Sequence, residues 1–272
     1  EEGRRRLHRL LVEGDGDALP WIHGAPAMDG FTGWFDRGVP LGPYLMPYRR
    51  LQRILTDMRR AREGVMVAGI GESLTVHPHV YVPSDASVPA MYARFASLLS
   101  GRDVLDIGTG TGVLAILAAK LGARSVVATD ISPHAVANAR ENVRRTNTGA
   151  TVCVKDAAPL FQAVDGGTFD VVMFNAPWID GEPRTRYDTA RYDPGFGVLS
   201  EFLAGCAGRL RLGGAALVQL SDIGRAGGAD PIALLVERAS ASGLTVASTA
   251  SIDRRSRTAG GTETVYVFEL RA

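Results

Sequence analysis

The chain has 272 residues, of which 46% are hydrophobic and 22% charged, and its formal net charge is +1. A chain of this length can bury a full core, so we expect a soluble globular protein with one large domain and an N-terminal extension. The small net charge lacks the positive excess of proteins that rely on many phosphate contacts, so a nucleic-acid partner is allowed but not favoured. No apolar run reaches the roughly 20 residues that span a bilayer, so we expect no membrane association and a cytoplasmic location.

The first 83 residues are predicted to form the extension, and residues 84–272 the large domain. Five prolines with several glycines predict irregular, surface-wrapping turns between Pro20 and Pro47. Apolar residues at helical spacing predict an amphipathic helix from Tyr48 to Arg62. Its arginines could contact a polyanion, but a solvated helix face is the simpler interpretation.

Short β-type runs broken by glycine and proline predict a hairpin between Gly64 and Pro83. This hairpin contains His77 and His79, which would share one face of a strand, but no third metal ligand is evident nearby, so no metal site is predicted. Cys153 and Cys206 lie in unrelated predicted elements without metal-ligand spacing. We therefore expect core thiols rather than a disulfide or a zinc site.

Helices and strands alternate through the rest of the chain, which predicts a parallel sheet covered by helices. The last two strands have no helix between them, so they should pair antiparallel. The expected helices are Ser87–Leu99, Val113–Leu121, Gly197–Leu210 and Pro231–Ser242, and the expected strands lie before Gly108, at Ser125–Thr129, near Val152, and at Phe169–Phe174, Ala215–Leu220, Leu244–Ser251 and Thr264–Leu270.

A glycine-rich loop follows the first of these strands, with Gly108, Gly110 and Gly112 at alternate positions. Glycine is needed where a backbone turns sharply and approaches a ligand closely, and Asp130, at the end of the next strand, can accept hydrogen bonds from ribose hydroxyls. These features together predict a site for an adenosine derivative.

The loop does not match a dinucleotide site, because the GxGxxG fingerprint requires glycine where Val113 stands. Asp106, two residues before the first glycine, would also repel a pyrophosphate. A carboxylate there suits a ligand that carries an ammonium or sulfonium group, and S-adenosylmethionine carries both.

The segment from Val104 to Arg145 resembles the first two motifs of class I S-adenosylmethionine-dependent methyltransferases. The resemblance implies a Rossmann-like α/β fold with a seven-stranded, mostly parallel sheet whose last strand is antiparallel, and it implies S-adenosylmethionine as cofactor with no metal. Asp156, after the third strand, would bind the adenine amino group with help from the Ala157 amide, although a solvated loop acid is the alternative. The implied cofactor residues are Asp106, Gly108, Thr109, Gly110, Gly112, Asp130, Ile131, Asp156, Ala157 and Asn175.

The strand at Phe169–Phe174 runs into Asn175, Ala176, Pro177 and Trp178. Strand carboxyl ends are where open α/β sheets bind ligands. The motif resembles the NPPY motif of methyltransferases that act on nitrogen, including those of release-factor glutamine, RNA guanine or adenine, and DNA adenine.

That resemblance implies a geometric mechanism, in which the Asn175 side chain and a backbone carbonyl accept the two N–H bonds of the acceptor nitrogen. Proline lacks an N–H and keeps Ala176 extended, which leaves the Ala176 carbonyl free for a substrate. Trp178 would pack on the planar acceptor group. Ala176 replaces the usual first proline and Trp178 the usual tyrosine or phenylalanine, and the alternative is a proline-terminated strand with Trp178 in the core.

Two segments rich in arginine and tyrosine are expected to contact the substrate. The first is the long loop from Asp180 to Phe196, a candidate lid, and the second is the arginine cluster after the strand at Leu244–Ser251. Exposed loop charges are the alternative for each arginine. The candidate substrate residues are Trp178, Arg184, Arg186, Tyr187, Tyr192, Arg254 and Arg255.

Two further resemblances concern the acceptor. The segment from Val76 to Ser84 resembles the one before the glycine motif in glutamine methyltransferases, and Val113–Asn142 is similar to ribosomal-protein L11 methyltransferases. The predicted activity is methyl transfer to nitrogen of a protein side chain, or of a small molecule or peptide. An RNA base N-methyltransferase and a non-catalytic S-adenosylmethionine-binding module remain alternatives.

Overall fold

The computed structural model describes residues 11–15, 43–47, 52, 55–56, 59–61, 63–83, 91–183, 188–228, 230–255 and 261–272. Arg184, Arg186 and Tyr187, and the first residues of the helix expected at Ser87–Leu99, lie outside these ranges. Within the described part, no helix has both the length and the apolar character needed to cross a membrane.

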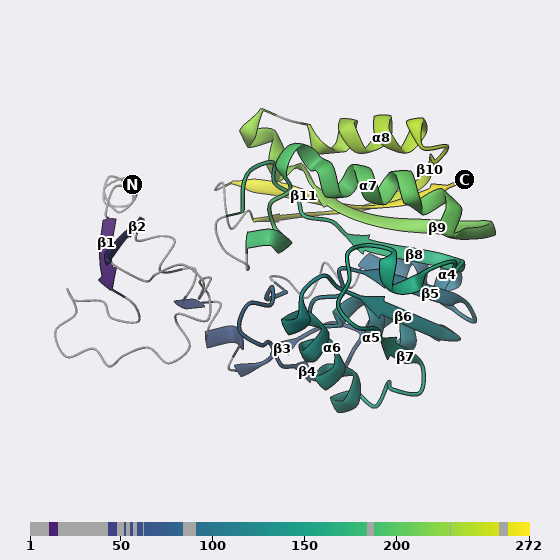
Figure 1. The fold of residues 1–272 in the computed structure, drawn as a ribbon, viewed down its shortest axis with the longest axis horizontal. Coiled ribbons are helices and arrows are strands. Elements are labelled where there is room, and N and C mark those ends of the chain that lie inside the picture. Colours follow the sequence, from purple (N-terminus) through teal and green to yellow (C-terminus); the bar gives the residue numbers. More distant parts are fainter. Residues whose placement is uncertain are drawn as a thin grey trace.

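A seven-stranded sheet forms the centre of the molecule, with the strand order β10-β11-β9-β8-β5-β6-β7 (Figure 1). All neighbouring strands from β7 to β9 are parallel, whereas β11 is antiparallel to both β9 and β10. The expected mostly parallel sheet with an antiparallel last strand is confirmed. Its strands are β5 (Asp103–Ile107), β6 (Ser125–Thr129), β7 (Val152–Val154), β8 (Phe169–Asn175), β9 (Leu210–Ser221), β10 (Thr245–Arg255) and β11 (Thr262–Arg271).

Helices cover both faces of this sheet. Side chains in β5 alternate between the two hydrophobic clusters, since Val104 packs in one cluster and Leu105 in the other. The first cluster includes α4 (Ala96–Leu99), α5 (Val113–Lys120) and α6 (Pro133–Arg145); the second includes α7 (Gly197–Cys206) and α8 (Pro231–Ala241). The 3-10 helices in the described part of the chain are η2 (Met91–Phe95), η3 (Gln162–Val164), η4 (Asp188–Ala190), η5 (Pro194–Phe196), η6 (Ala207–Arg209) and η7 (Asp222–Gly227).

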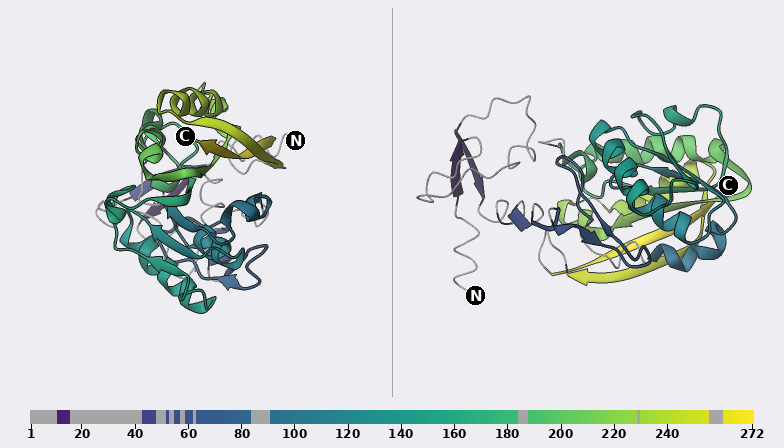
Figure 2. Two further views of the ribbon diagram at one scale, coloured as in Figure 1. Left: turned by 90° about the vertical axis from the view of Figure 1, so that its right-hand side faces the viewer. Right: turned by 90° about the horizontal axis from the view of Figure 1, so that it is seen from below.

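The last two strands are longer than the hydrophobic pattern predicts, and they lie at one edge of the sheet (Figure 2). Their pairing continues to Arg254↔Glu263 and Arg255↔Thr262. The placement of Arg254 and Arg255 in a loop is therefore wrong, because polar cross-strand pairs extend the hairpin beyond its apolar part.

The segment before the sheet packs on the same core. The described residues between 52 and 63 are helical, and β3 (Val65–Met66) pairs antiparallel with β4 (Ser73–Leu74), which confirms a short hairpin. Asn138 and Asn142, four residues apart on α6, hold the chain after this hairpin. The Asn142 Oδ1 accepts the Thr75 N–H at 2.9 Å, and the Asn138 Oδ1 accepts the His77 N–H at 3.0 Å.

Two expectations are wrong, that of turns alone between Pro20 and Pro47 and that of a core position for Cys153, whereas the core position of Cys206 is confirmed. Residues 43–47 form β2 (Pro43–Pro47), which pairs with β1 (Leu11–Asp15), rather than only turns. The prolines sit at the two ends of β2, where a strand tolerates the missing N–H.

Cys153 is exposed because β7 is the edge strand, whereas Cys206 is buried and its burial raises the pKa of the thiol to about 12.

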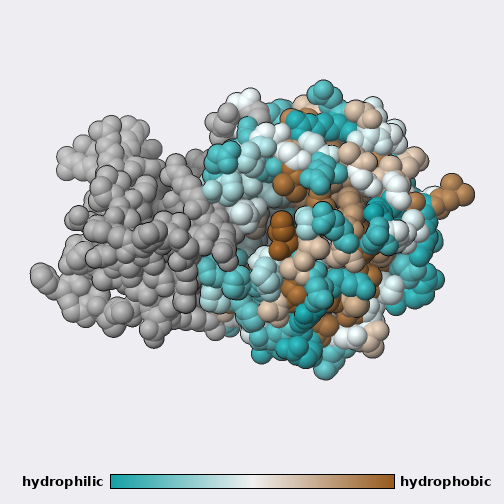
Figure 3. Space-filling model, in the orientation of Figure 1, coloured by the Kyte–Doolittle hydropathy of each residue, from teal (hydrophilic) through white to brown (hydrophobic). Residues whose placement is uncertain are grey.

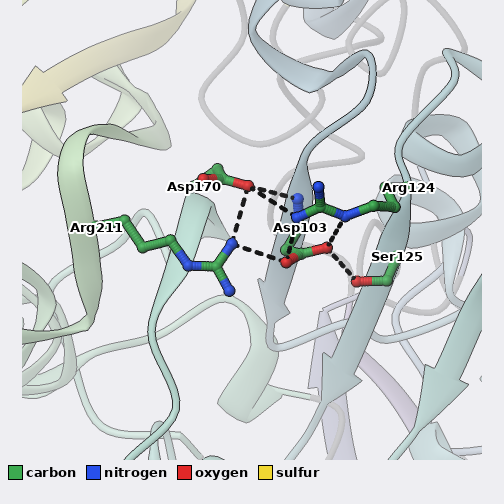
Figure 4. Close-up of polar contacts among 5 residues, drawn as sticks. All are labelled: Asp103, Arg124, Ser125, Asp170 and Arg211. Carbon is green, nitrogen blue, oxygen red and sulfur yellow. Dashed lines mark hydrogen bonds and ion pairs between the residues drawn. The ribbon is translucent and has the colours of Figure 1, made fainter.

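The amino ends of the central strands are joined by an ionic cluster (Figure 4). The Asp103 N–H donates to Asp170 Oδ2 at 2.8 Å, and Arg211 Nη1 contacts Asp103 Oδ2 at 2.7 Å and Asp170 Oδ2 at 3.0 Å. Hydrogen bonds from Arg124 hold the pKa of Asp103 well below its usual range.

The face of the molecule in Figure 3 shows hydrophobic side chains gathered near its middle and hydrophilic ones around much of its border.

Candidate active site

The glycine loop connects β5 to α5 in a conformation that needs glycine. Gly110 has φ of +56° and Gly112 has φ of +82°, a region that other residues rarely adopt. A Cβ on Gly112 would lie 3.3 Å from the Ala139 Cα, so this glycine also lets the loop approach α6. The Thr109 N–H donates to the Thr129 carbonyl at 2.9 Å, which holds the loop beside β6.

Asp130 anchors this loop from the end of β6. Its Oδ2 accepts the Gly110 N–H and its Oδ1 accepts the Ser132 N–H, each at 2.9 Å. Burial raises the pKa of Asp130. A carboxylate has about four lone-pair sites, so beside these donors and the Ile131 N–H it retains capacity for a ribose hydroxyl. The adjacent Ile131 is 66% exposed and offers an apolar surface beside it.

Asp106 is buried beneath the same loop, with 1% of its surface exposed. Its Oδ2 accepts hydrogen bonds from Thr109 Oγ1 at 2.7 Å and from the Ala115 N–H at 3.2 Å. Burial raises its pKa to about 7, and the neighbouring charge of Asp130 adds to this shift. A buried carboxylate is stabilised by a cation, so Asp106 fits the ammonium group of an amino-acid ligand.

The predicted adenine residues lie beside Asp130 but face solvent. The Ala158 N–H donates to the Asp130 carbonyl at 3.0 Å, which places Ala157 and Asp156 next to the end of β6. The Asp156 side chain is 97% exposed and forms an ion pair with Arg140 at 2.8 Å. This contact agrees with the solvated-acid alternative, and a role in adenine binding stays a prediction.

The acceptor motif begins at the carboxyl end of β8. Asn175 is the last strand residue, Ala176 and Pro177 are buried, and Trp178 is half-buried. The Trp178 Nε1–H donates to Asn175 Oδ1 at 3.1 Å. Trp178 packs against both hydrophobic clusters, so its ring lies at the border of the core and the site.

Strand register brings the donor loop and the acceptor motif together. Ile107 of β5 pairs with Phe174 of β8, so the residues that follow, Gly108 and Asn175, leave neighbouring strands at the same edge of the sheet. A Cβ on Gly108 would lie 3.5 Å from the Phe174 ring. Ile107 also pairs with Thr129, which places Asp130 on the other side of the glycine loop.

The fold brings some of the predicted substrate residues to this edge. The Arg254 guanidinium carbon lies 5.0 Å from the centroid of the Trp178 ring. Tyr192 is half-buried, and its backbone bridges to Ile179, next to Trp178. Arg255, the next residue of β10, is exposed.

One residue of this region has no sequence signal. Glu263 is 3% exposed and forms an ion pair with Arg254 at 2.6 Å. An isolated glutamate before an apolar strand indicates a solvated charge. Only the pairing of β10 with β11 reveals its partner. A register prediction for the two strands could have found this pair.

Comparisons with known proteins agree with this geometry. Residues 91–176, less than half of the chain, match a family model described as ribosomal protein L11 methyltransferase. A protein of Methanocaldococcus jannaschii, named as a candidate protein N5-glutamine methyltransferase, is 36% identical over 119 residues, which cover 44% of this chain and 57% of that protein. The ribosomal protein L11 methyltransferase of Burkholderia ambifaria is 46% identical over 79 residues, covering 29% of this chain and 24% of that protein.

Among solved structures, a methyltransferase from Pyrococcus furiosus has the same fold, with a TM-score of 0.56 and 24% sequence identity. The match covers 81% of this chain and 97% of that one. Together with the strand order and the glycine loop, these similarities indicate a class I S-adenosylmethionine-dependent methyltransferase. Within that class, its central segment is similar to proteins named for methylation of ribosomal protein L11 and of protein glutamine.

Proposed function

We propose that this chain transfers a methyl group from S-adenosylmethionine to a nitrogen atom of a protein side chain. The observation that carries the proposal is the register of β5 and β8, because it sets Asn175 beside the glycine loop. A ligand bound by the loop and an acceptor nitrogen bound to Asn175 would therefore be close neighbours. The names of the two curated relatives, which this chain matches over 57% and 24% of their lengths, favour a protein acceptor.

The donor site fits S-adenosylmethionine by its charge and by its hydrogen-bonding groups. Asp130 would accept the ribose hydroxyls, Ile131 would contact the adenine, and Asp106 would face the ammonium group. Thr111 Oγ1 and Thr129 Oγ1 are buried and have no hydrogen-bond partner within the described residues, so polar groups of a ligand could satisfy them. When bound, S-adenosylmethionine supplies an electrophilic methyl group on its sulfonium.

Asn175 and Ala176 would orient the acceptor rather than activate it with a strong base. The amide oxygen of Asn175 and the backbone carbonyl of Ala176 can each accept one N–H of the acceptor nitrogen. Orientation of this kind, together with exclusion of water, contributes about 7–11 kcal/mol in favourable intramolecular reactions. Binding in the correct geometry can therefore supply a large part of the rate acceleration.

Residues 1–83 and the loop from Asp180 to Phe196 are proposed to select the acceptor. Asp193 fixes the described end of that loop, because its carboxylate accepts the N–H groups of Val198 and Leu199 at 2.9 and 3.0 Å. A loop that is fixed at its end and exposes residues such as Asp180 and Glu182 suits a lid over a protein side chain. We also propose that the extension ends at residue 83 and that the catalytic domain begins at residue 84.

The experiment is methyl transfer from radiolabelled S-adenosylmethionine into a lysate of the source organism by the full chain. Label that is released by protease supports a protein acceptor. Label that is released by ribonuclease, or that passes a size filter, would instead identify an RNA base or a small molecule. Asn175→Ala should abolish transfer without weakening the binding of S-adenosylhomocysteine.

A matched control removes a different amide. Gln162 is exposed at the start of η3, so Gln162→Ala should label the same fraction as the wild type. If the Asn175→Ala protein labels its acceptor at the wild-type rate, the assignment of Asn175 is wrong. If the wild-type protein binds S-adenosylhomocysteine but labels nothing, a non-catalytic binding module becomes the better interpretation.

A further inference from the structure

Four contacts hold Trp178 in place. The N–H groups of Trp178 and Ile179 both donate to the Arg191 carbonyl, at 3.2 and 3.0 Å. A Cβ on Gly224 would lie 3.1 Å from the Trp178 carbonyl oxygen, so η7 packs closely on its backbone. The indole N–H donates to Asn175, and Arg254 covers the ring. Trp178 is thus fixed by its backbone and by its side chain.

The indole contact determines which way the Asn175 amide faces. An indole Nε1–H is a donor only, so the atom it contacts must be the amide oxygen and not the amide nitrogen. The Asn175 Oδ1 has a second lone pair, which remains for the N–H of a methyl acceptor. Trp178 therefore orients the group that we propose binds the acceptor nitrogen.

Arg254 is held in turn by Glu263. The two residues are cross-strand partners of β10 and β11, and both Nε and Nη2 of Arg254 lie 2.6 Å from Glu263 Oε1. The Arg254 side chain is 11% exposed and the Glu263 side chain 3%. Breaking a buried ion pair of this kind costs much free energy, because removing one partner leaves an uncompensated buried charge.

We propose that the Arg254–Glu263 pair positions Trp178 and, through it, the Asn175 amide. The inference rests on the proposed function, and it makes Arg254 a positioning residue rather than a group that contacts substrate. The guanidinium is committed to Glu263 on one side and to the Trp178 ring on another. The C-terminal hairpin β10–β11 thereby becomes part of the acceptor site.

The physical link tested first is the orientation of Trp178, which needs no methyl acceptor. The chain has three tryptophans, so Trp178→Phe identifies the Trp178 indole signal in a ¹H–¹⁵N spectrum of the whole protein. Asn175→Ala should shift that signal, because it removes the hydrogen-bond acceptor. Arg254→Met should shift both the indole signal and the Asn175 side-chain amide signals, and Arg254→Lys should restore them in part.

Arg255→Ala is the matched control, since Arg255 is the exposed neighbour of Arg254 on the same strand. It should leave all three signals at their wild-type positions. Arg254→Met alone would leave Glu263 unpaired and could unfold the chain, so the same spectra are recorded for Arg254→Met combined with Glu263→Gln. If the indole and amide signals of both variants stay at their wild-type positions, the inference is overturned.

The functional consequence is measured by the rate of methyl labelling in the acceptor fraction. Misplacing reacting groups by 1 Å can cost on the order of 100-fold, so a smaller displacement in the Arg254→Met and Glu263→Gln double variant should lower the rate about tenfold. Its affinity for S-adenosylhomocysteine should not change. Shifted signals with no labelling by the wild type would refute the proposed function but not the positioning. Shifted signals with an unchanged labelling rate would overturn the role in positioning the acceptor.

Discussion

The backbone N–H of Gly110 donates to Asp130 Oδ2 at 2.9 Å, which joins the glycine loop to the end of the neighbouring strand. Asp130 therefore has two tasks, since it holds the loop closed and would bind the ribose. A substitution here should affect ligand binding through both.

Asp130→Ala should weaken the binding of S-adenosylhomocysteine by roughly 100-fold. Hydrogen bonds to a charged group contribute about 1.5–3 kcal/mol each, and the variant loses both the ribose acceptor and the anchor of Gly110. Isothermal titration calorimetry measures the change. Asp165→Ala, which removes an exposed aspartate, should bind like the wild type. Equal affinities of the two variants would contradict the assignment of Asp130.

Gly112→Ala should destabilise the fold more than Gly166→Ala. Both glycines have positive φ, +82° and +67°, so alanine costs about 1–2 kcal/mol of backbone strain at either position. Only at Gly112 would the new Cβ also approach another backbone, at 3.3 Å from Ala139, whereas Gly166 faces open space. Urea unfolding of the two variants measures the difference. The steric argument is refuted if Gly166→Ala loses as much stability as Gly112→Ala.

The ligand-free protein should lose stability as pH rises through neutrality. The pKa of Asp106 in the fold is about 7, above its ordinary value of 3.8, and a raised pKa stabilises the protein below the lower value. That stabilisation is lost between the two pKa values and is gone above pH 7; the full shift corresponds to at most about 4 kcal/mol, of which about 3 kcal/mol lies above pH 5. The free energy of unfolding, compared at pH 5 and pH 8, measures the loss.

Asp106→Asn is the control for this pH dependence, because the amide does not titrate. The slope between pH 5 and pH 8 should become shallower in the variant. An unchanged slope would mean that another group is responsible, and Asp130, whose pKa is also raised by burial, would be the next to substitute.

The ionic cluster at the amino ends of the strands should affect stability but not the donor site. Asp170→Ala removes the acceptor of the Asp103 N–H and a partner of Arg211, so we expect a loss of about 1–2 kcal/mol in unfolding free energy. Affinity for S-adenosylhomocysteine should stay at the wild-type value, because that site lies at the carboxyl ends. Chemical denaturation and calorimetry on one preparation test both statements, and a weakened affinity would show unexpected coupling across the sheet.

The donor loop could be predicted because its signals are local. The glycines at 108, 110 and 112 report backbone conformation, and the spacing to Asp130 follows from one strand–helix–strand unit. The position of Asn175 was also predictable, since a proline ends the apolar strand. These features depend on neighbours in sequence, so one chain is enough to recognise them.

Features that depend on strand pairing could not be predicted in the same way. Arg254 and Glu263 are nine residues apart in sequence, and they become partners only through the register of β10 and β11. The sequence predicts a core position for Cys153, but its exposure depends on β7 lying at the edge of the sheet. The tail of β10 is polar, so its hydrophobic pattern ends before the strand does.

Helix α6 begins just after Asp130 with Ser132 as its cap, and it carries Asn138 and Asn142, which hold the chain at Thr75 and His77. The two amides lie four residues apart and so face one side of the helix. A single residue inserted between Ser132 and Asn138 would rotate both by about 100° away from the chain they hold. The number of residues separating Asp130 from these asparagines is therefore a fixed length of this fold, which tolerates substitution far better than insertion or deletion.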